Sequence, residues 1–231
     1  MKTYARFYRS VVAVSLALCA ILTTVSVLLM PPFEGGYVQH LQAVADAGAS
    51  ATVSALAFTL SQLPFIIGLV GVAHLARRGA PVLAGLGGAL AVLGGFGHAV
   101  YGGVSTVILV MAADPANYEA HAAVLAAGEG GVQVPFLLLG LAGTVLGTIL
   151  IAVGLLRAKV GPAWLPWVLI GFVLVEFVGT NFSDWATVAS GVLFLLGFLT
   201  LAAVVTRSDV REWSAAADEI PAPVGAAMVR P

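Results

Sequence analysis

Residues 132–156 read VQVPFLLLGLAGTVLGTILIAVGLL, a stretch without a single charged side chain. A helix needs about 20 predominantly apolar residues to cross the hydrocarbon core of a bilayer. The stretch therefore predicts a membrane-spanning helix. The rest of the chain contains further stretches of this kind at residues 10–30, 50–75, 81–112, 163–182 and 185–206. We thus expect an all-α, polytopic membrane protein, with a bundle of six transmembrane helices in residues 1–207 and a polar cytoplasmic tail at residues 208–231.

The composition of the whole chain supports a membrane environment. Apolar residues make up 60% and charged residues only 9%, whereas soluble domains carry about 25% charged residues. The formal net charge is −1, so there is no overall basic field to attract nucleic acid. The predicted partner is the lipid bilayer, and a protein partner would be another membrane protein or a second copy of this chain.

The positions of the cations predict the orientation. In a six-span arrangement all ten Lys and Arg residues fall on one side, and the loops on the other side contain none. Cytoplasmic loops of membrane proteins carry an excess of Lys and Arg. Both termini are therefore predicted to be cytoplasmic, in the cell inner (plasma) membrane. The opposite loops carry the carboxylates Glu34, Asp46, Asp114, Glu119, Glu129 and Asp184.

Each end of the chain allows two interpretations. A cleavable signal peptide has an apolar core of about 7–15 residues and a small-x-small cleavage site. The stretch at 10–30 is longer and ends Leu-Leu-Met-Pro-Pro, which predicts an uncleaved first helix. In the tail, Val210, Trp213 and Ala217 are spaced to lie along the inner membrane surface. A disordered tail is the alternative.

Small residues recur at three- and four-residue spacing on two of the predicted helices. Such residues let helix backbones approach closely, which supplies van der Waals packing inside a membrane. The pattern predicts a compact bundle with the helices at 81–112 and 132–156 near its centre. The residues are Ala84, Gly88, Ala91, Gly95, His98, Gly102 and Ser105 on the first, and Gly140, Thr144, Gly147 and Thr148 on the second.

Two ionisable residues are predicted to lie deep in the membrane. His98 lies roughly 24 Å and Glu176 roughly 20 Å along their helices from the inner ends, at ~1.5 Å per residue. A lone ionised carboxylate in hydrocarbon is costly, which favours a buried pair between the two residues at the wall of a cavity. The alternative is a protonated Glu176 bonded to a carbonyl or to Thr180, with His98 as a neutral packing residue. Gln62, beside the helix-breaking Pro64, completes the cavity-lining candidates.

Two short sequences occur twice, in the same order. Tyr37-Val-Gln-His40 resembles Tyr118-Glu-Ala-His121, and Gln62-Leu-Pro-Phe65 resembles Gln133-Val-Pro-Phe136. The order is that of a parallel internal repeat. However, His40 and Gln62 are 22 positions apart, and His121 and Gln133 only 12. Chance similarity in a biased composition is the alternative.

The loops that carry His40 and His121 are predicted to form short amphipathic helices, at 38–44 and 118–125. These two histidines are the candidate metal ligands, since imidazole and carboxylate oxygen suit zinc. The sequence has no His-x-x-His or Glu-x-x-His spacing, so it predicts no metal site of its own. It also predicts no cofactor, because a bis-histidine haem needs two deep imidazoles and no glycine-rich phosphate loop or His-Glu-x-x-His is present.

Three function classes follow from this pattern. The first is small-molecule or lipid-facing transport, or an accessory role beside another membrane protein. The second is a membrane-embedded enzyme in which Glu176 acts as general acid on a lipid-like substrate, with His98 and Asp184 as the other catalytic candidates. The third is an interaction protein of the immunity or assembly type.

The layout of the whole chain resembles that of known families. The length, the six predicted spans, the start of the fifth span at Pro162-Ala-Trp-Leu-Pro-Trp167 and the short charged tail resemble small multi-pass membrane families of unknown function. The richness in Ala, Gly, Val and Leu, with eight Arg against two Lys, is similar to membrane proteins from GC-rich actinobacterial genomes. The resemblance implies the layout and no functional residue.

Overall fold

The computed structural model describes residues 2–33, 35–183 and 185–214, and every regular element in them is a helix. Five helices are long and apolar enough to cross a membrane. This confirms the predicted all-α fold and agrees with a multi-pass membrane protein. The five helices are α1 (Lys2–Leu29), α3 (Ala49–Ala76), α4 (Pro81–Ala112), α6 (Val134–Ala158) and α8 (Trp185–Arg207).

The stretch at 163–182 departs most from the predicted length. It forms α7 (Leu165–Phe177), with 13 residues, and a 3₁₀ turn, η2 (Gly179–Asn181). Thirteen helical residues rise only ~20 Å, less than the ~30 Å of a bilayer core. Beyond Phe177, side chains of the following turn bind carbonyls at the end of the helix. The Thr180 hydroxyl donates to the Glu176 carbonyl at 2.5 Å, and the Asn181 amide donates to the Phe177 carbonyl at 3.3 Å.

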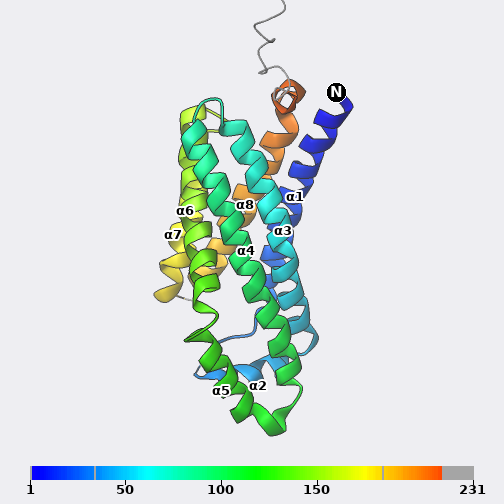
Figure 1. The fold of residues 1–231 in the computed structure, drawn as a ribbon, viewed down its shortest axis with the longest axis vertical. Helices are drawn as coiled ribbons and strands as arrows, with labels where there is room; N and C mark the ends of the chain where they lie inside the picture. Colours follow the sequence, from blue (N-terminus) through cyan, green and yellow to red (C-terminus); the bar gives the residue numbers. More distant parts are fainter. Residues whose placement is uncertain (1, 34, 184, 215–231) are drawn as a thin grey trace, which may run out of the picture.

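The six apolar helices form a closed ring, in chain order (Figure 1). α1 packs against α3, α3 against α4, α4 against α6, α6 against α7 and α7 against α8, and α8 returns to α1. Among the described elements, α4 and α6 pack together more extensively than any other pair. The predicted position of these two helices near the centre of the bundle is wrong. They lie in the wall of the ring and not at its centre, because α4 also packs against α3 and α6 also packs against α7.

Two lines of glycine on α4 serve two different neighbours. A Cβ built on Gly97 would lie 2.3 Å from the Gly140 nitrogen of α6, and one on Gly94 would lie 2.5 Å from the Thr144 nitrogen. Gly95 of the predicted stripe faces α3 instead, where its Cβ would lie 2.4 Å from Ile66 Cγ1. The glycines of the predicted stripe thus make the α3 contact, and the line through Gly94 and Gly97 makes the α6 contact.

Two short helices cover one end of the ring (Figure 1). α2 (Tyr37–Ala47) and α5 (Tyr118–Glu129), the latter preceded by the turn η1 (Pro115–Asn117), confirm the short helices predicted there. They pack against each other and against α4. The Tyr37 hydroxyl donates to the Glu129 carboxylate. We call this layer the cap. Its own hydrophobic cluster consists of Leu41, Val44, Ala51, Ala112, Tyr118 and Leu125.

Of the two repeated sequences, only Tyr-x-x-His occupies equivalent positions in the structure. Tyr37 and Tyr118 each begin a cap helix, so the order long helix, cap helix, long helix occurs twice along the chain. Pro64 lies inside α3, whereas Pro135 lies in the first turn of α6. The two Gln-x-Pro-Phe segments therefore occupy unequal positions, as their unequal spacing from the histidines requires.

Charge separates the two ends of the described bundle. The cap end carries Asp46, Asp114, Glu119 and Glu129, while Glu34 and Asp184 lie outside the described residues. The cations lie at the start of α1, between α3 and α4, around the end of α6 and from the end of α8 onward. Those described are Arg6, Arg9, Arg77, Arg78, Arg157, Lys159, Arg207 and Arg211. We call this the basic end.

The start of the predicted tail packs onto the basic end. Residues Val210–Trp213 form a 3₁₀ turn, η3, that contacts α1. The buried Trp213 ring stacks on His74 of α3, with ring centroids 5.2 Å apart. Its Nε1–H donates to Ser208 Oγ at 2.8 Å, and Arg9 donates to the Ser208 carbonyl at 2.7 Å. The tail is therefore folded at least as far as Ser214. Residue Ala217 of the predicted amphipathic face lies outside the described residues.

Trp213→Ala is expected to release residues 208–214 from the bundle, because the ring stack and the indole hydrogen bond are both lost. Limited proteolysis in detergent should then cut at Arg207 or Arg211 faster than in the wild type. Trp167→Ala is the control, since that exposed indole lies on α7 and should leave the cutting rate unchanged. Equal cutting of Trp213→Ala and wild type would show that the stack does not hold the tail.

Candidate functional site

A cavity lies at the centre of the ring, and all six helices contribute to its wall. Its volume is about 120 Å³, which corresponds to about four water molecules at ~30 Å³ each. Ser190 lies in the second turn of α8, and Glu176 is the last residue but one of α7. Because both helix ends point toward the cap, the cavity lies nearer to the cap end than to the basic end.

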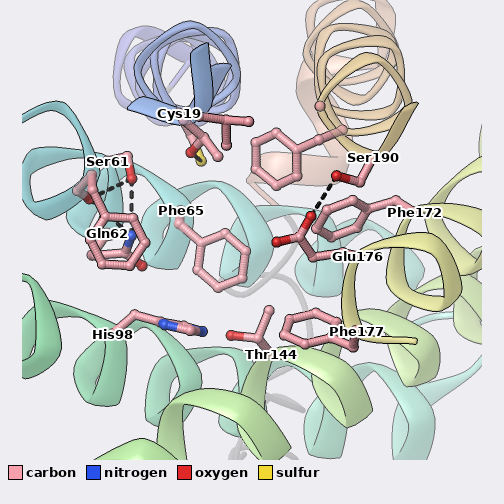
Figure 2. Close-up of a pocket in the computed structure, with 15 residues that line it drawn as sticks. Cys19, Ser61, Gln62, Phe65, His98, Thr144, Phe172, Glu176, Phe177 and Ser190 are labelled. Carbon is pink, nitrogen blue, oxygen red and sulfur yellow. Dashed lines mark hydrogen bonds between the residues drawn. The ribbon is translucent and has the colours of Figure 1, made fainter. Parts of the chain in front are cut away.

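The wall combines polar side chains with phenyl rings. Figure 2 shows the Glu176 carboxyl pointing into the cavity between Phe65 and Phe172. No Lys or Arg occurs among the described lining residues. The polar members are Cys19, Thr23, Ser61, Gln62, His98, Thr144, Glu176 and Ser190, and the aromatic members are Phe58, Phe65, Phe172, Phe177 and Phe194.

Glu176 is held by α8. The Ser190 Oγ lies 2.5 Å from Glu176 Oε2 and 2.9 Å from the Thr187 carbonyl. A hydroxyl has one proton to donate. Ser190 satisfies both contacts at once when the Glu176 carboxyl carries the proton and donates to Ser190. It can instead donate to an ionised Glu176 and leave the Thr187 carbonyl. Ser190 is therefore a hydrogen-bond partner for the carboxyl in either arrangement.

The hypothesis of a direct His98–Glu176 pair is not supported. Both side chains line the same cavity, yet within the described chain no hydrogen bond or ion pair joins them. The imidazole meets the Phe58 ring edge to face, with centroids 5.8 Å apart. Similar depth on two helices does not make a pair, because the cavity separates α4 from α7. The Thr180 alternative is also different in detail, since Thr180 binds the Glu176 backbone and not its carboxyl.

Thr144 presents a hydroxyl without a partner. Its residue is 6% exposed, and its Oγ1 is fully buried and forms no hydrogen bond. Figure 2 shows the side chain pointing toward His98 across the cavity. Other threonines in these helices donate to a carbonyl of their own helix three or four residues earlier. They are Thr24, Thr52, Thr59, Thr106, Thr180, Thr200 and Thr206. Thr144 thus does not bind its own backbone, and its Oγ1 lies at the α4–α6 contact, where a Cβ built on Gly94 would be 2.7 Å away.

Gln62 belongs to the polar break around Pro64. Pro64 cannot donate to the Leu60 carbonyl. The neighbouring side chains bind other groups of the same helix and not this carbonyl. Gln62 Nε2 donates to the Phe58 carbonyl at 2.9 Å and to Ser61 Oγ at 3.0 Å. The amide group is therefore fixed by its own helix, and its oxygen is the acceptor at the cavity wall.

The other predicted site residues lie away from the cavity. His121 Nε2 lies 3.3 Å from Asp114 Oδ2, and His40 packs on the Phe33 ring. The Asn117 amide, with His121, holds the pKa of Asp114 below its usual value, whereas burial lowers the pKa of His40. Among the described residues no three ligand side chains converge on a metal position. The catalytic candidate Asp184 lies outside the described residues.

Comparison of the chain with protein-family models, with characterised proteins and with solved structures gives no match. The geometry of the cavity is therefore the basis for a functional assignment.

Sequence reasoning missed two members of the site. Ser190 was not among the predicted site residues, and Thr144 was predicted only as part of a small-residue stripe. Serine and threonine serve both for close packing and for hydrogen bonding in membrane helices. Spacing alone therefore does not separate packing residues from site residues. The signal that separates them is the hydrogen-bond partner, which only the folded ring supplies.

Proposed function

We propose that this protein is a transporter of a small solute, with Glu176 as the group that takes up and releases a proton. The observation that carries the proposal is the central cavity, whose wall includes all six helices and the one carboxylate within the apolar stretches. Ionisable residues inside membranes mark substrate and proton pathways. Here the carboxyl has a hydroxyl partner that accommodates both of its protonation states.

The proposal includes six crossings of the cell inner (plasma) membrane, with both termini in the cytoplasm. α6 ends at the basic end and α8 begins toward the cap end, so the chain returns between them through α7 and η2. The excess of Lys and Arg at the basic end supports its placement inside the cell. The cap would then face outward.

The cavity favours transport over the lipid-modifying enzyme. Pockets for drug-sized ligands typically measure ~300–1,000 Å³, well above the volume found here. A small solute that passes through fits the enclosed volume better than a lipid that reacts in it.

Cysteine accessibility tests the proposal. In a Cys19→Ala background, Thr23→Cys places a thiol at the cavity, and Ile21→Cys places one on the exposed side of α1. A small, charged, membrane-impermeant thiol reagent is applied to intact cells and to inside-out vesicles. We expect Thr23→Cys to react from both sides, because a transporter opens its site alternately, and Ile21→Cys to react from neither.

Two outcomes would overturn transport. Reaction of Thr23→Cys from one side only would indicate a binding protein without passage. Protection of Thr23→Cys from both sides would indicate a closed bundle whose cavity is a packing defect.

A further inference from the structure

We propose that the central cavity binds a small organic ammonium ion, with Glu176 as its counter-ion. This inference deepens the proposed function and rests on it, since it names the class of solute that the site accepts. Three features of the cavity wall lead to it: the charge of the lining residues, the number of phenyl rings and the partnerless hydroxyl of Thr144.

The charge of the wall selects the sign of the ligand. Glu176 is the only Asp or Glu among the lining residues, and the described wall contains no Lys or Arg. His98 is the one other titratable group facing the carboxyl apart from the Cys19 thiol. A site with one carboxylate and no fixed cation attracts a cation and repels an anion.

The phenyl rings favour an organic cation over a metal ion. Five rings, from α3, α7 and α8, line the cavity, and the face of an aromatic ring attracts a cation. A metal ion prefers several oxygen or nitrogen ligands, and among the described residues no three His, Cys, Asp or Glu side chains converge on a metal position. An ammonium ion with alkyl groups matches both the rings and the carboxylate.

Thr144 adds a polar contact on the wall opposite Glu176. Its buried Oγ1 has no partner among the described residues, and Figure 2 shows Thr144 beside His98, on a different wall of the cavity from Glu176. A buried polar group without a hydrogen bond is costly. A ligand that brings N–H groups into the cavity would satisfy Thr144 and Glu176 together.

The volume limits the size of the ion. About 120 Å³ holds on the order of four to five non-hydrogen atoms, at ~30 Å³ per water-sized group. Propylammonium and tetramethylammonium are of this size. They are also useful probes because the first has N–H donors and the second has none.

The test measures binding to the purified full-length protein at pH 7. Titration calorimetry is performed with propylammonium, tetramethylammonium, 1-propanol and propionate. We expect saturable binding of both cations and none of the neutral alcohol or the anion. Glu176→Gln is expected to weaken cation binding by at least tenfold, because a charge-assisted contact is lost.

Thr144→Val and Thr148→Val form a matched pair. Both threonines lie on α6, and both Oγ1 atoms are buried without a partner, but only Thr144 lines the cavity. Thr144→Val is expected to weaken propylammonium about fivefold and to leave tetramethylammonium unchanged, because the latter cannot donate a hydrogen bond. Thr148→Val should bind both ions as the wild type does.

Phe172→Leu keeps the inference testable if Glu176→Gln does not fold. The leucine retains apolar bulk and removes one ring, so tetramethylammonium should bind several-fold more weakly. Equal binding of 1-propanol and propylammonium would overturn the inference, and so would cation binding that is unaffected by Glu176→Gln, Phe172→Leu and Thr144→Val together.

The failure of this inference and that of transport are distinguishable. If Thr23→Cys reacts from both sides while no ammonium ion binds, transport stands with a different solute. If the cations bind while Thr23→Cys reacts from one side only, the ammonium site stands and transport is wrong.

Discussion

The Gly97→Ala protein is expected to unfold at a clearly lower temperature than the wild type, with a loss of about 1–3 kcal/mol. The added Cβ would lie 2.3 Å from the Gly140 nitrogen and 2.5 Å from the Phe136 carbonyl oxygen. Both are backbone atoms of α6, so no side chain can turn away to make room. The helices must separate, and the van der Waals packing between them is what holds a membrane bundle together.

Gly103→Ala is the matched control on the same helix. A Cβ there meets no atom within 4 Å, and alanine favours a helix over glycine by about 0.5–1 kcal/mol. Thermal unfolding in detergent, followed by size-exclusion chromatography of heated samples, should place Gly103→Ala at or above the wild type. An unfolding temperature of Gly97→Ala equal to that of Gly103→Ala would contradict the close α4–α6 contact.

Phe198→Ala is expected to destabilise the fold by about 2–3 kcal/mol. Phe198 is fully buried and stacks between Phe194, at a centroid distance of 4.1 Å, and Phe65, at 5.9 Å. In water-soluble cores the same change costs about 3–5 kcal/mol. The expected value is smaller here because lipid tails are as apolar as the protein interior, so mainly the packing contribution is lost.

The same unfolding assay checks Phe198→Ala, with Phe182→Ala as control. Phe182 is 83% exposed, so its truncation should change stability by less than about 0.5 kcal/mol. Because Phe65 and Phe194 line the central cavity, Phe198→Ala should also loosen that wall. Equal stability of the two variants would show that the stack of three rings is not part of the stabilising core.

Much of the fold is predictable from local composition. An apolar stretch of about 20 residues predicts a membrane-spanning helix. The amphipathic pattern of the two loops predicts the short helices α2 and α5. The short length of α7 is less predictable. Its apolar run extends to Phe182, but the helix ends at Phe177 and is followed by the turn η2. A helix that ends at Phe177 and one that continues to Phe182 would bury similar residues, so composition does not distinguish the two.

The candidate site is predictable in its members and not in its contacts. Depth along a helix indicates that Gln62, His98 and Glu176 lie inside the bundle. It does not indicate which way each helix turns, and so it suggested a His98–Glu176 pair where the structure has Ser190 beside Glu176. Likewise, α4 has glycines on two faces, and spacing alone does not assign Gly95 to α3 and Gly97 to α6.

The closure of the ring by α8 against α1 has a consequence for biogenesis. Residues contributed by the first and the last apolar helix, such as Cys19 and Ser190, lie on one wall of the cavity. Until α8 packs against α1 and α7, Glu176 lacks its hydroxyl partner Ser190. Docking of α8 therefore both closes the ring and supplies the hydrogen bond of the buried acid, which couples the two events during folding.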